Sequence, residues 1–216
     1  MVYCNIKKGG PSVSFFAGPN VNHKVFMSNH RAWEEKYQIR SLDDVPEPAA
    51  FLREHAAMLG AGGTALDIAM GAGQNGVFFA RRGYSVTGVD QSCAAVLLAR
   101  ELAHDNGVSI DAVAADMLDW PFSENYFDVI LNFYYLEPAL VPRIKAGLKK
   151  GGLLFFETYT LDQQRFDGPH NPDFLLKPNE LLESFLDLFI LFYHERIEPN
   201  GKGGYRAVAS MIAKKV

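Results

Sequence analysis

From residue 46 onward, short apolar segments alternate with segments that carry helical periodicity and helix-end signals. The apolar segments predict strands, at residues 64–69, 85–89, 110–115, 127–133 and 153–159. Helices are predicted beside them, at residues 48–59, 74–82, 93–106, 139–148 and 178–185. Two last strands, 188–196 and 206–214, are joined without a helix, so one of them must run antiparallel to the rest. The alternation predicts an α/β fold with a doubly wound, mostly parallel seven-stranded sheet and an antiparallel C-terminal hairpin.

Residues 1–26 differ from the rest of the chain. They are rich in Gly, Pro, Asn and Ser and show no clear period, so they are predicted to be an irregular N-terminal extension. Helical character is expected to begin near Arg31, and Met27 is an alternative start of the natural protein that mass spectrometry of its N-terminus would test. Residues 27–216 are predicted to form one domain, in which the long segment 160–177 is a candidate lid.

The overall charge argues against a nucleic-acid partner. The net charge is −4 and the isoelectric point is about 5.9, whereas a generic nucleic-acid binder needs a basic face. No apolar run reaches the ~20 residues that span a bilayer, so no membrane partner is expected. Cys4 and Cys93 are too few for a disulfide framework and form no CxxC spacing, which fits a cytoplasmic location. No His/Cys cluster has metal-ligand spacing, and the sequence leaves the oligomeric state open.

The strongest local signal is the sequence LDIAMGAGQNG at residues 66–76. A predicted buried strand ends there, the chain turns on Gly71 and Gly73, and a helix begins. Both glycines permit backbone angles and a close approach of a ligand that a Cβ would forbid, and the following helix presents free N–H groups. Residues 71–76 also fit GxGxxG, a pattern of dinucleotide-binding folds. A plain tight turn is the other interpretation.

Three acidic residues mark the ends of three successive predicted strands: Asp67, Asp90 and Asp116. Asp90 can accept hydrogen bonds from both hydroxyls of a ribose, or serve only as a turn or cap acid beside Ser92. Asp116 can accept from an adenine amino group, or be a solvated strand-end acid. Ligands of open α/β sheets bind at the carboxyl edge of the strands, so a shared ligand site is the favoured interpretation.

Together these residues resemble a class I S-adenosylmethionine-dependent methyltransferase, from about Trp33 to the C-terminus. The resemblance rests on LDIAMGAG at 66–73, VDxS at 89–92, Asp116 with WPF at 120–122, FDVIL at 127–131 and LKKGG at 148–152. GQNG at 73–76 with GYSVT at 83–87 is similar to the tellurite-resistance and thiopurine-type branches, and VASMIAKK at 208–215 also resembles the former. The resemblance implies a Rossmann-like fold, S-adenosylmethionine as cofactor, and a small-molecule methyl acceptor.

The same resemblance assigns the amino-acid part of the cofactor to two strand ends. Asp67 would hold the methionine amino group, and Gly71 and Gly73 would accommodate the methionyl and ribose parts. Asn132 and Phe133, at the end of the strand 127–133, would face the methyl donor.

The nucleoside is assigned to the two strands that follow the glycine turn. Asp90, with Gln91 beside it, would bind the ribose hydroxyls, while Asp116 and Met117 would frame the adenine. One departure concerns Ala69 and Met70, where many relatives have Gly-Cys or Gly-Thr. The bulkier Met70 is expected to narrow the floor of the pocket.

Residues that contact the acceptor are expected after the fourth and fifth strands. The catalytic candidates are Asn132, Tyr134 and Glu157, although Tyr134 is also explained as a packing aromatic. Further candidates for acceptor contact are Tyr135, Glu137, Tyr159, Arg165 and His170. Methyl transfer from a sulfonium needs mainly in-line placement, and a general base only if the acceptor must lose a proton.

Two alternative functions remain open beside the methyltransferase. The glycine turn also suits an NAD(P)-dependent oxidoreductase, although Asp67 fits an ammonium group better than a diphosphate. A protein that binds S-adenosylmethionine without catalysis is the other alternative. Trp33 and Tyr37, spaced i, i+4 on one helix face, are either a cover over the cofactor or only a packing pair.

Overall fold

A computed structural model describes residues 4–5, 12–13 and 23–216, and side chains from residue 31 onward. The chain forms two compact units. The first comprises Met1–Ala50 with Met58–Pro121, and the second comprises Phe51–Ala57 with Phe122–Val216.

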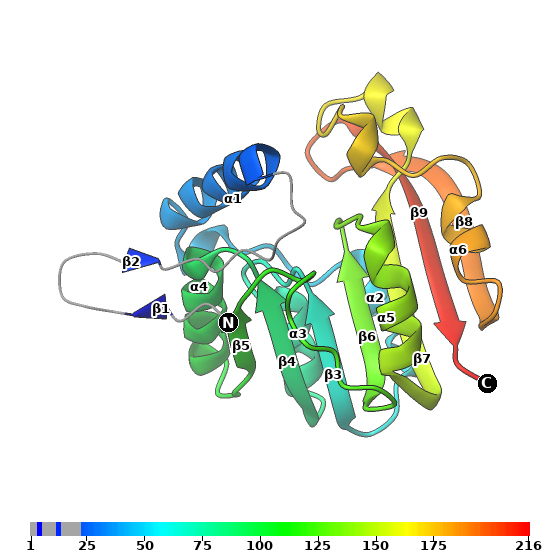
Figure 1. The fold of residues 1–216 in the computed structure, drawn as a ribbon, viewed down its shortest axis with the longest axis horizontal. Helices are drawn as coiled ribbons and strands as arrows, with labels where there is room; N and C mark the ends of the chain where they lie inside the picture. Colours follow the sequence, from blue (N-terminus) through cyan, green and yellow to red (C-terminus); the bar gives the residue numbers. More distant parts are fainter. Residues whose placement is uncertain (1–3, 6–11, 14–22) are drawn as a thin grey trace. The chain divides into compact units, whose positions relative to one another are not determined.

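The first unit contains a three-stranded parallel sheet. Its strands are β3 (Gly63–Ile68), β4 (Tyr84–Asp90) and β5 (Asp111–Ala114), and β4 pairs with both neighbours in parallel. Its helices are α1 (His23–Gln38), α3 (Gln74–Ala80) and α4 (Cys93–Asp105), with a 3-10 turn, η1, at Leu42–Asp44. A separate antiparallel pair is formed by β1 (Cys4–Asn5) and β2 (Ser12–Val13). Figure 1 shows α4 beside β4 and β5, and α1 beside α4.

Helix α4 begins and ends where its sequence signals predict. The Ser92 hydroxyl accepts a hydrogen bond from the Ala95 N–H at 3.1 Å, which satisfies one of the unpaired donors of the first turn. The chain leaves the helix through Gly107, whose φ of +68° is a left-handed conformation that glycine adopts without strain. Both ends therefore follow from local chemistry.

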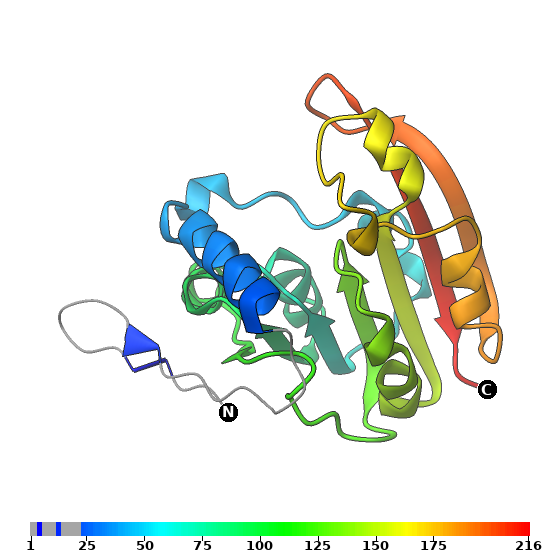
Figure 2. The same ribbon diagram turned by 45° about the horizontal axis from the view of Figure 1, so that its top comes forward.

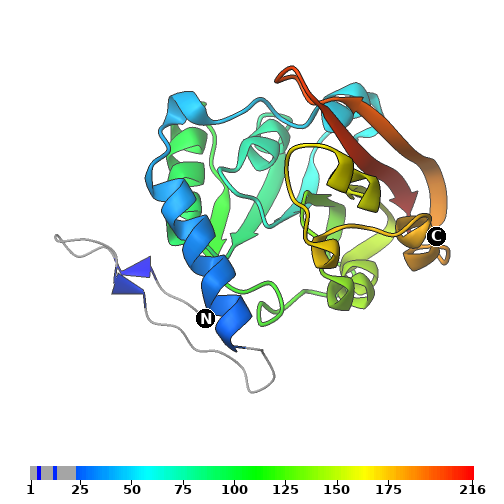
Figure 3. The ribbon, with the colours of Figure 1, turned by 90° about the horizontal axis from the view of Figure 1, so that it is seen from above.

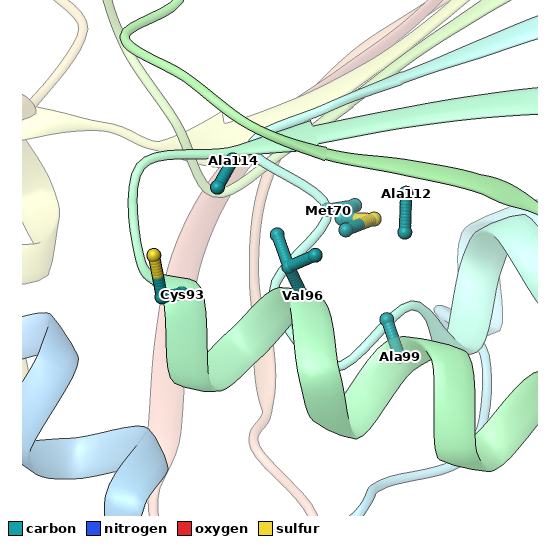
Figure 4. Packing of buried hydrophobic residues seen from close by; sticks show 6 residues of the cluster. All are labelled: Met70, Cys93, Val96, Ala99, Ala112 and Ala114. Atoms are coloured by element: carbon teal, nitrogen blue, oxygen red, sulfur yellow. The ribbon is translucent and has the colours of Figure 1, made fainter. Parts of the chain in front are cut away.

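Small side chains on α4 allow a tight core against the sheet. This α4 cluster consists of Met70, Cys93, Val96, Ala99, Ala112 and Ala114. Figure 4 shows Met70 lying between α4 and the strands, with Val96 and Ala99 of α4 facing it. Gly88 of β4 makes room for Met70, because a Cβ at residue 88 would overlap the Met70 sulfur.

The second unit contains four strands: β6 (Phe127–Phe133), β7 (Leu148–Tyr159), β8 (Phe189–Pro199) and β9 (Tyr205–Lys214). β7 is parallel to β6, and β9 is antiparallel to both β7 and β8. The helices are α5 (Val141–Gly147) and α6 (Glu180–Ser184), with 3-10 turns η2 (Ala56–Met58), η3 (Pro138–Leu140), η4 (Leu161–Arg165) and η5 (Pro172–Phe174). Helix α2 (Ala50–Glu54) precedes η2. In Figure 2 the yellow segment that follows β7 lies beside the start of β9.

The strand order of the described main sheet is β5-β4-β3-β6-β7-β9-β8. This confirms the predicted α/β fold with its seven-stranded, mostly parallel sheet, and it identifies β9 as the antiparallel strand. Several boundaries differ from the prediction. The segment 1–26, expected to be irregular, contains β1, β2 and the start of α1. β7 begins at Leu148 instead of residue 153, and the predicted helix 48–59 is divided into α2 and η2. Helix α1 begins at His23 instead of near Arg31, and the predicted loop 160–177 contains η4 and η5. Within the described residues, no helix combines the length and apolar character needed to cross a membrane.

Candidate functional site

The turn after β3 is built from left-handed backbone. Ala69, Gly71 and Gly73 have φ angles of +50°, +57° and +79°. Two backbone–backbone hydrogen bonds hold the turn: the Met70 N–H donates to Val89 O, and the Gly73 N–H donates to Met70 O, both at 3.0 Å. Ala69 occupies a left-handed conformation in which a Cβ costs roughly 1 kcal/mol.

Asp67 is a buried carboxylate one residue before the end of β3. Its exposed fraction is 1%, and its Oδ2 atom has no hydrogen-bond partner among the described residues. Burial raises the pKa of Asp67 to about 7, the Gly76 N–H opposes this rise, and the nearby Asp90 carboxylate adds to it. An unpartnered buried acceptor indicates that a donor group belongs beside it, since burying a polar atom without a partner costs free energy.

Asp90, at the end of β4, holds the glycine turn and the start of α4 together. Its Oδ2 accepts from the Gly71 N–H at 2.8 Å, and its Oδ1 accepts from the Ser92 N–H at 2.9 Å. The turn-acid interpretation of Asp90 is therefore confirmed. It does not exclude the ribose role, because a carboxylate can accept about four hydrogen bonds.

The third acid lies just beyond β5. The Ala115 N–H donates to Asp90 O at 2.9 Å, which places the following Asp116 next to the end of β4. Asp116 is half-buried and its Oδ1 accepts from the Leu118 N–H at 2.8 Å, while Met117 is buried at 4% exposed. Gln91 is half-buried beside Asp90. The structure thus brings the ends of β3, β4 and β5 together at the glycine turn.

The two glycines of the turn face different neighbours. A Cβ on Gly71 would overlap the hydroxyl of Tyr37, which reaches the turn from α1. A Cβ on Gly73 would lie 2.7 Å from the Ala99 Cβ on α4. The expectation that a side chain at Gly73 would fill the space of the ligand is therefore wrong, because that side of the residue packs against α4.

The expectation that Met70 narrows the pocket floor is also wrong. Met70 is 4% exposed and packs in the α4 cluster, on the Gly88 side of β4 (Figure 4). The core between α4 and the strands therefore accommodates the Met70 side chain.

Sequence reasoning named Tyr37 only as part of a cover or a packing pair, and it overlooked Glu34. The Glu34 Oε2 accepts from the Ser92 hydroxyl at 2.7 Å and from the Ala94 N–H at 3.2 Å. These bonds fix α1 to the first turn of α4, next to which α1 lies in Figure 3. The i, i+4 spacing of Trp33 and Tyr37 was the sequence signal that indicated a role for this face of α1. The rings of these two residues stack with their centroids 6.2 Å apart.

In the second unit, Asn132 and Phe133 end β6 and are buried. The Asn132 amide donates to Tyr135 O at 2.7 Å and so shapes the turn that follows the strand. Glu137 accepts from the Ala139 N–H at 3.1 Å as the cap of η3, which gives it a structural role.

Tyr134 and Glu157 belong to one polar network that is centred on the buried Glu157 carboxylate, while Tyr134 itself is 36% exposed. The Tyr134 hydroxyl donates to Glu157 Oε1 at 2.7 Å and accepts from Arg206. Glu157 is 0% exposed, and its Oε2 accepts from Ser210 and from Arg196, the latter at 3.1 Å. Burial and the Glu157 charge raise the pKa of Tyr134 well above its usual range. Tyr134 therefore stays protonated and is unsuited to act as a general base.

Arg165 and His170 line one surface hollow of about 410 Å³ in the second unit. Its other lining residues are Gln164, Phe166, Asp167, Asn200, Gly204 and Tyr205. The Phe166 and Tyr205 rings lie 6.0 Å apart, so the hollow joins the segment after β7 to the turn between β8 and β9. Among the described residues, no three His, Cys, Asp or Glu side chains are grouped to hold a metal ion.

Comparison with known proteins agrees with this geometry. Residues 65–152 match the family described as "Methyltransferase domain". A ubiquinone biosynthesis O-methyltransferase from Nitrosococcus oceani is 32% identical over 148 residues, which are 65% of this chain and 61% of that protein. The chain thus spans about six tenths of the length of this curated relative.

Two solved structures share the fold. TehB from Haemophilus influenzae has a TM-score of 0.70 at 20% identity, over 85% of this chain and 67% of that chain. A geranyl diphosphate C-methyltransferase from Streptomyces coelicolor A3(2) has a TM-score of 0.59 at 19% identity, over 92% of this chain and 88% of that chain. The family match covers residues 65–152, and the two solved structures show the fold that this chain shares with them.

Proposed function

We propose that the protein binds S-adenosylmethionine at the glycine turn and transfers its methyl group to a small-molecule acceptor. The observation that carries the proposal is the buried Asp67 carboxylate beside a left-handed turn, whose Oδ2 has no hydrogen-bond partner in the part of the chain that the structure describes. The cofactor carries an ammonium group, which can supply the missing donor and a compensating charge. The matches to methyltransferases support the same assignment.

The residues of the first unit fit the rest of this cofactor. Asp90 has carboxylate oxygens at the end of β4 for the ribose hydroxyls, and Asp116 lies at the next strand end for the adenine amino group. Gln91 and Met117 flank these two acids, and Gly71 provides the close backbone approach. In this assignment Gly73 contributes its left-handed backbone and its packing on α4.

When bound, S-adenosylmethionine supplies a methyl carbon that the sulfonium makes electrophilic. The protein then contributes mainly by placing the acceptor in line with it. We assign Asn132 and Phe133 to the wall that faces the methyl group, since both lie buried at the carboxyl end of β6. Tyr134 and Glu157 are assigned a positioning role, because the hydrogen bonds of the buried network hold the Tyr134 ring in a fixed place.

The acceptor is proposed to be a small molecule. The curated relatives are named for O-methylation in ubiquinone biosynthesis, so phenolic hydroxyls are the first acceptors to assay. Thiols and selenium or tellurium oxyanions follow. We also propose a cytoplasmic location, which the sequence predicts.

Calorimetry with S-adenosylhomocysteine and with NADH tests the cofactor. We expect the former to bind and the latter not to bind, since Asp67 would repel a diphosphate. Binding of NADH alone would support the oxidoreductase instead. Transfer of a labelled methyl group to any acceptor in a broad panel then separates an enzyme from a protein that only binds the cofactor.

A further inference from the structure

Helix α1 places a tyrosine hydroxyl directly at the glycine turn. The Tyr37 hydroxyl lies so close to Gly71 that a Cβ there would overlap it. Asp90 and Asp67 are near enough for their charges to act on Tyr37. Burial and these two carboxylates raise the pKa of Tyr37 to about 12. The phenol is therefore a protonated hydrogen-bond donor throughout the physiological range.

Because acidic residues lie beside the Tyr37 hydroxyl, an anionic ligand needs a hydrogen-bond donor of this kind in order to bind there. Asp67 and Asp90 would repel a carboxylate, and Asp90 already accepts from the N–H groups of Gly71 and Ser92. A neutral donor between acids can bind a carboxylate without adding negative charge, and hydrogen bonds to a charged acceptor are the stronger ones.

Resting on the proposed function, we infer that Tyr37 donates a hydrogen bond to the carboxylate of the bound cofactor, and that Glu34 holds α1 in the position this contact requires. Asp67 would then bind the ammonium and Tyr37 the carboxylate of the same amino-acid group. Neither Glu34 nor Tyr37 belongs to the strand ends from which the other cofactor residues come.

Glu34 has the contacts of a positioning residue. Its Oε2 accepts from the Ser92 hydroxyl and the Ala94 N–H, one helical turn before Tyr37. Glu35, next to it, instead pairs with Arg31 at 2.7 Å on the exposed side of α1. The two adjacent acids therefore provide a matched pair of variants on one helix.

The test compares two ligands, of which only one carries the amino-acid group with its carboxylate and ammonium. S-adenosylhomocysteine carries the amino-acid carboxylate, whereas 5′-methylthioadenosine has the same nucleoside and sulfur without it. We expect Tyr37→Phe to weaken S-adenosylhomocysteine binding about tenfold in calorimetry and to change 5′-methylthioadenosine binding by less than twofold. Equal affinity of wild type and variant for S-adenosylhomocysteine would overturn the inference. Equal losses for both ligands would also overturn it, because Tyr37 would then act on the nucleoside or on the fold.

The second arm tests Glu34 by the rate of ligand release. We expect Glu34→Ala to release S-adenosylhomocysteine several-fold faster in stopped-flow measurements, while Glu35→Ala releases it at the wild-type rate. Identical rates for the two variants would exclude the positioning role of Glu34. Failure of the wild-type protein to bind S-adenosylhomocysteine would instead refute the proposed function itself, so the two failures are distinguishable.

Discussion

Replacing Asp67 with asparagine should stabilise the protein while weakening its cofactor site. The pKa of Asp67 rises from 3.8 to about 7 on folding because the carboxylate is buried. At about 1.36 kcal/mol per pH unit, this increase corresponds to about 4 kcal/mol as an upper bound. A raised pKa favours the protonated form in the folded state. The stability that this group contributes is therefore complete below pH ~4 and is lost as the pH rises through about 7.

The asparagine variant has a neutral side chain of nearly the same shape, so its stability does not fall in this way as the pH rises. We expect Asp67→Asn to be about 2–4 kcal/mol more stable than wild type at pH 8 in urea unfolding, and only about 1 kcal/mol more stable at pH 5. Asp43→Asn, on the exposed face of η1, is the control and should leave stability unchanged at both pH values. A difference between Asp67→Asn and wild type that does not change with pH would refute the reasoning.

The same carboxylate should give ligand binding a matching pH dependence. If Asp67 binds the ammonium as an anion, the affinity of wild type for S-adenosylhomocysteine should fall about tenfold per pH unit below pH 7 and be flat above it. Asp67→Asn should bind about tenfold or more weakly at pH 8, without that slope. The buried charge would then be an example of stability given up for function. A wild-type affinity that is flat from pH 5 to 8 would contradict the assignment.

Three further predictions concern packing and the buried network. Gly73→Ala should lower the free energy of unfolding by about 1–3 kcal/mol, because its Cβ meets Ala99 and its φ is positive; Ala99→Gly in the same chain should restore part of this loss in thermal unfolding. Met70→Ala should cost about 2–4 kcal/mol by leaving a cavity, with unchanged S-adenosylhomocysteine affinity by calorimetry; a large loss of affinity would place Met70 in the site after all. Glu157→Ala should cost about 1–3 kcal/mol in urea unfolding, because the Tyr134 and Ser210 hydroxyls lose a buried acceptor while Arg196 keeps its ion pair with Glu198; unchanged stability would contradict this.

Much of the fold followed from local sequence signals. The strand 127–133 was predicted at its observed bounds, because its apolar run follows the polar turn residues 123–125. Ser92 and Gly107 marked the ends of α4, because a cap hydroxyl and a left-handed glycine act within one turn of the chain. The start of α1 was missed by several residues, since helix boundaries carry a weaker signal than helix interiors.

The site was predictable only where it is local in sequence. The glycine turn and the strand-end acids lie on consecutive elements, so their convergence followed from the parallel sheet. The Glu34 contact with Ser92 joins residues 58 positions apart, and no spacing rule identifies such a pair. The direction of the Met70 side chain depends on the missing Cβ of Gly88, which is a tertiary property of β4.

The Met70 side chain therefore occupies the space that a side chain at residue 88 would need, and glycine at residue 88 leaves that space free. Evolution at these two positions should proceed jointly: a smaller residue at 70 opens room for a side chain at 88, and neither change is neutral by itself. The residue types that position 70 of the glycine turn can accept therefore depend on Gly88 of the adjacent strand, eighteen residues further along the chain.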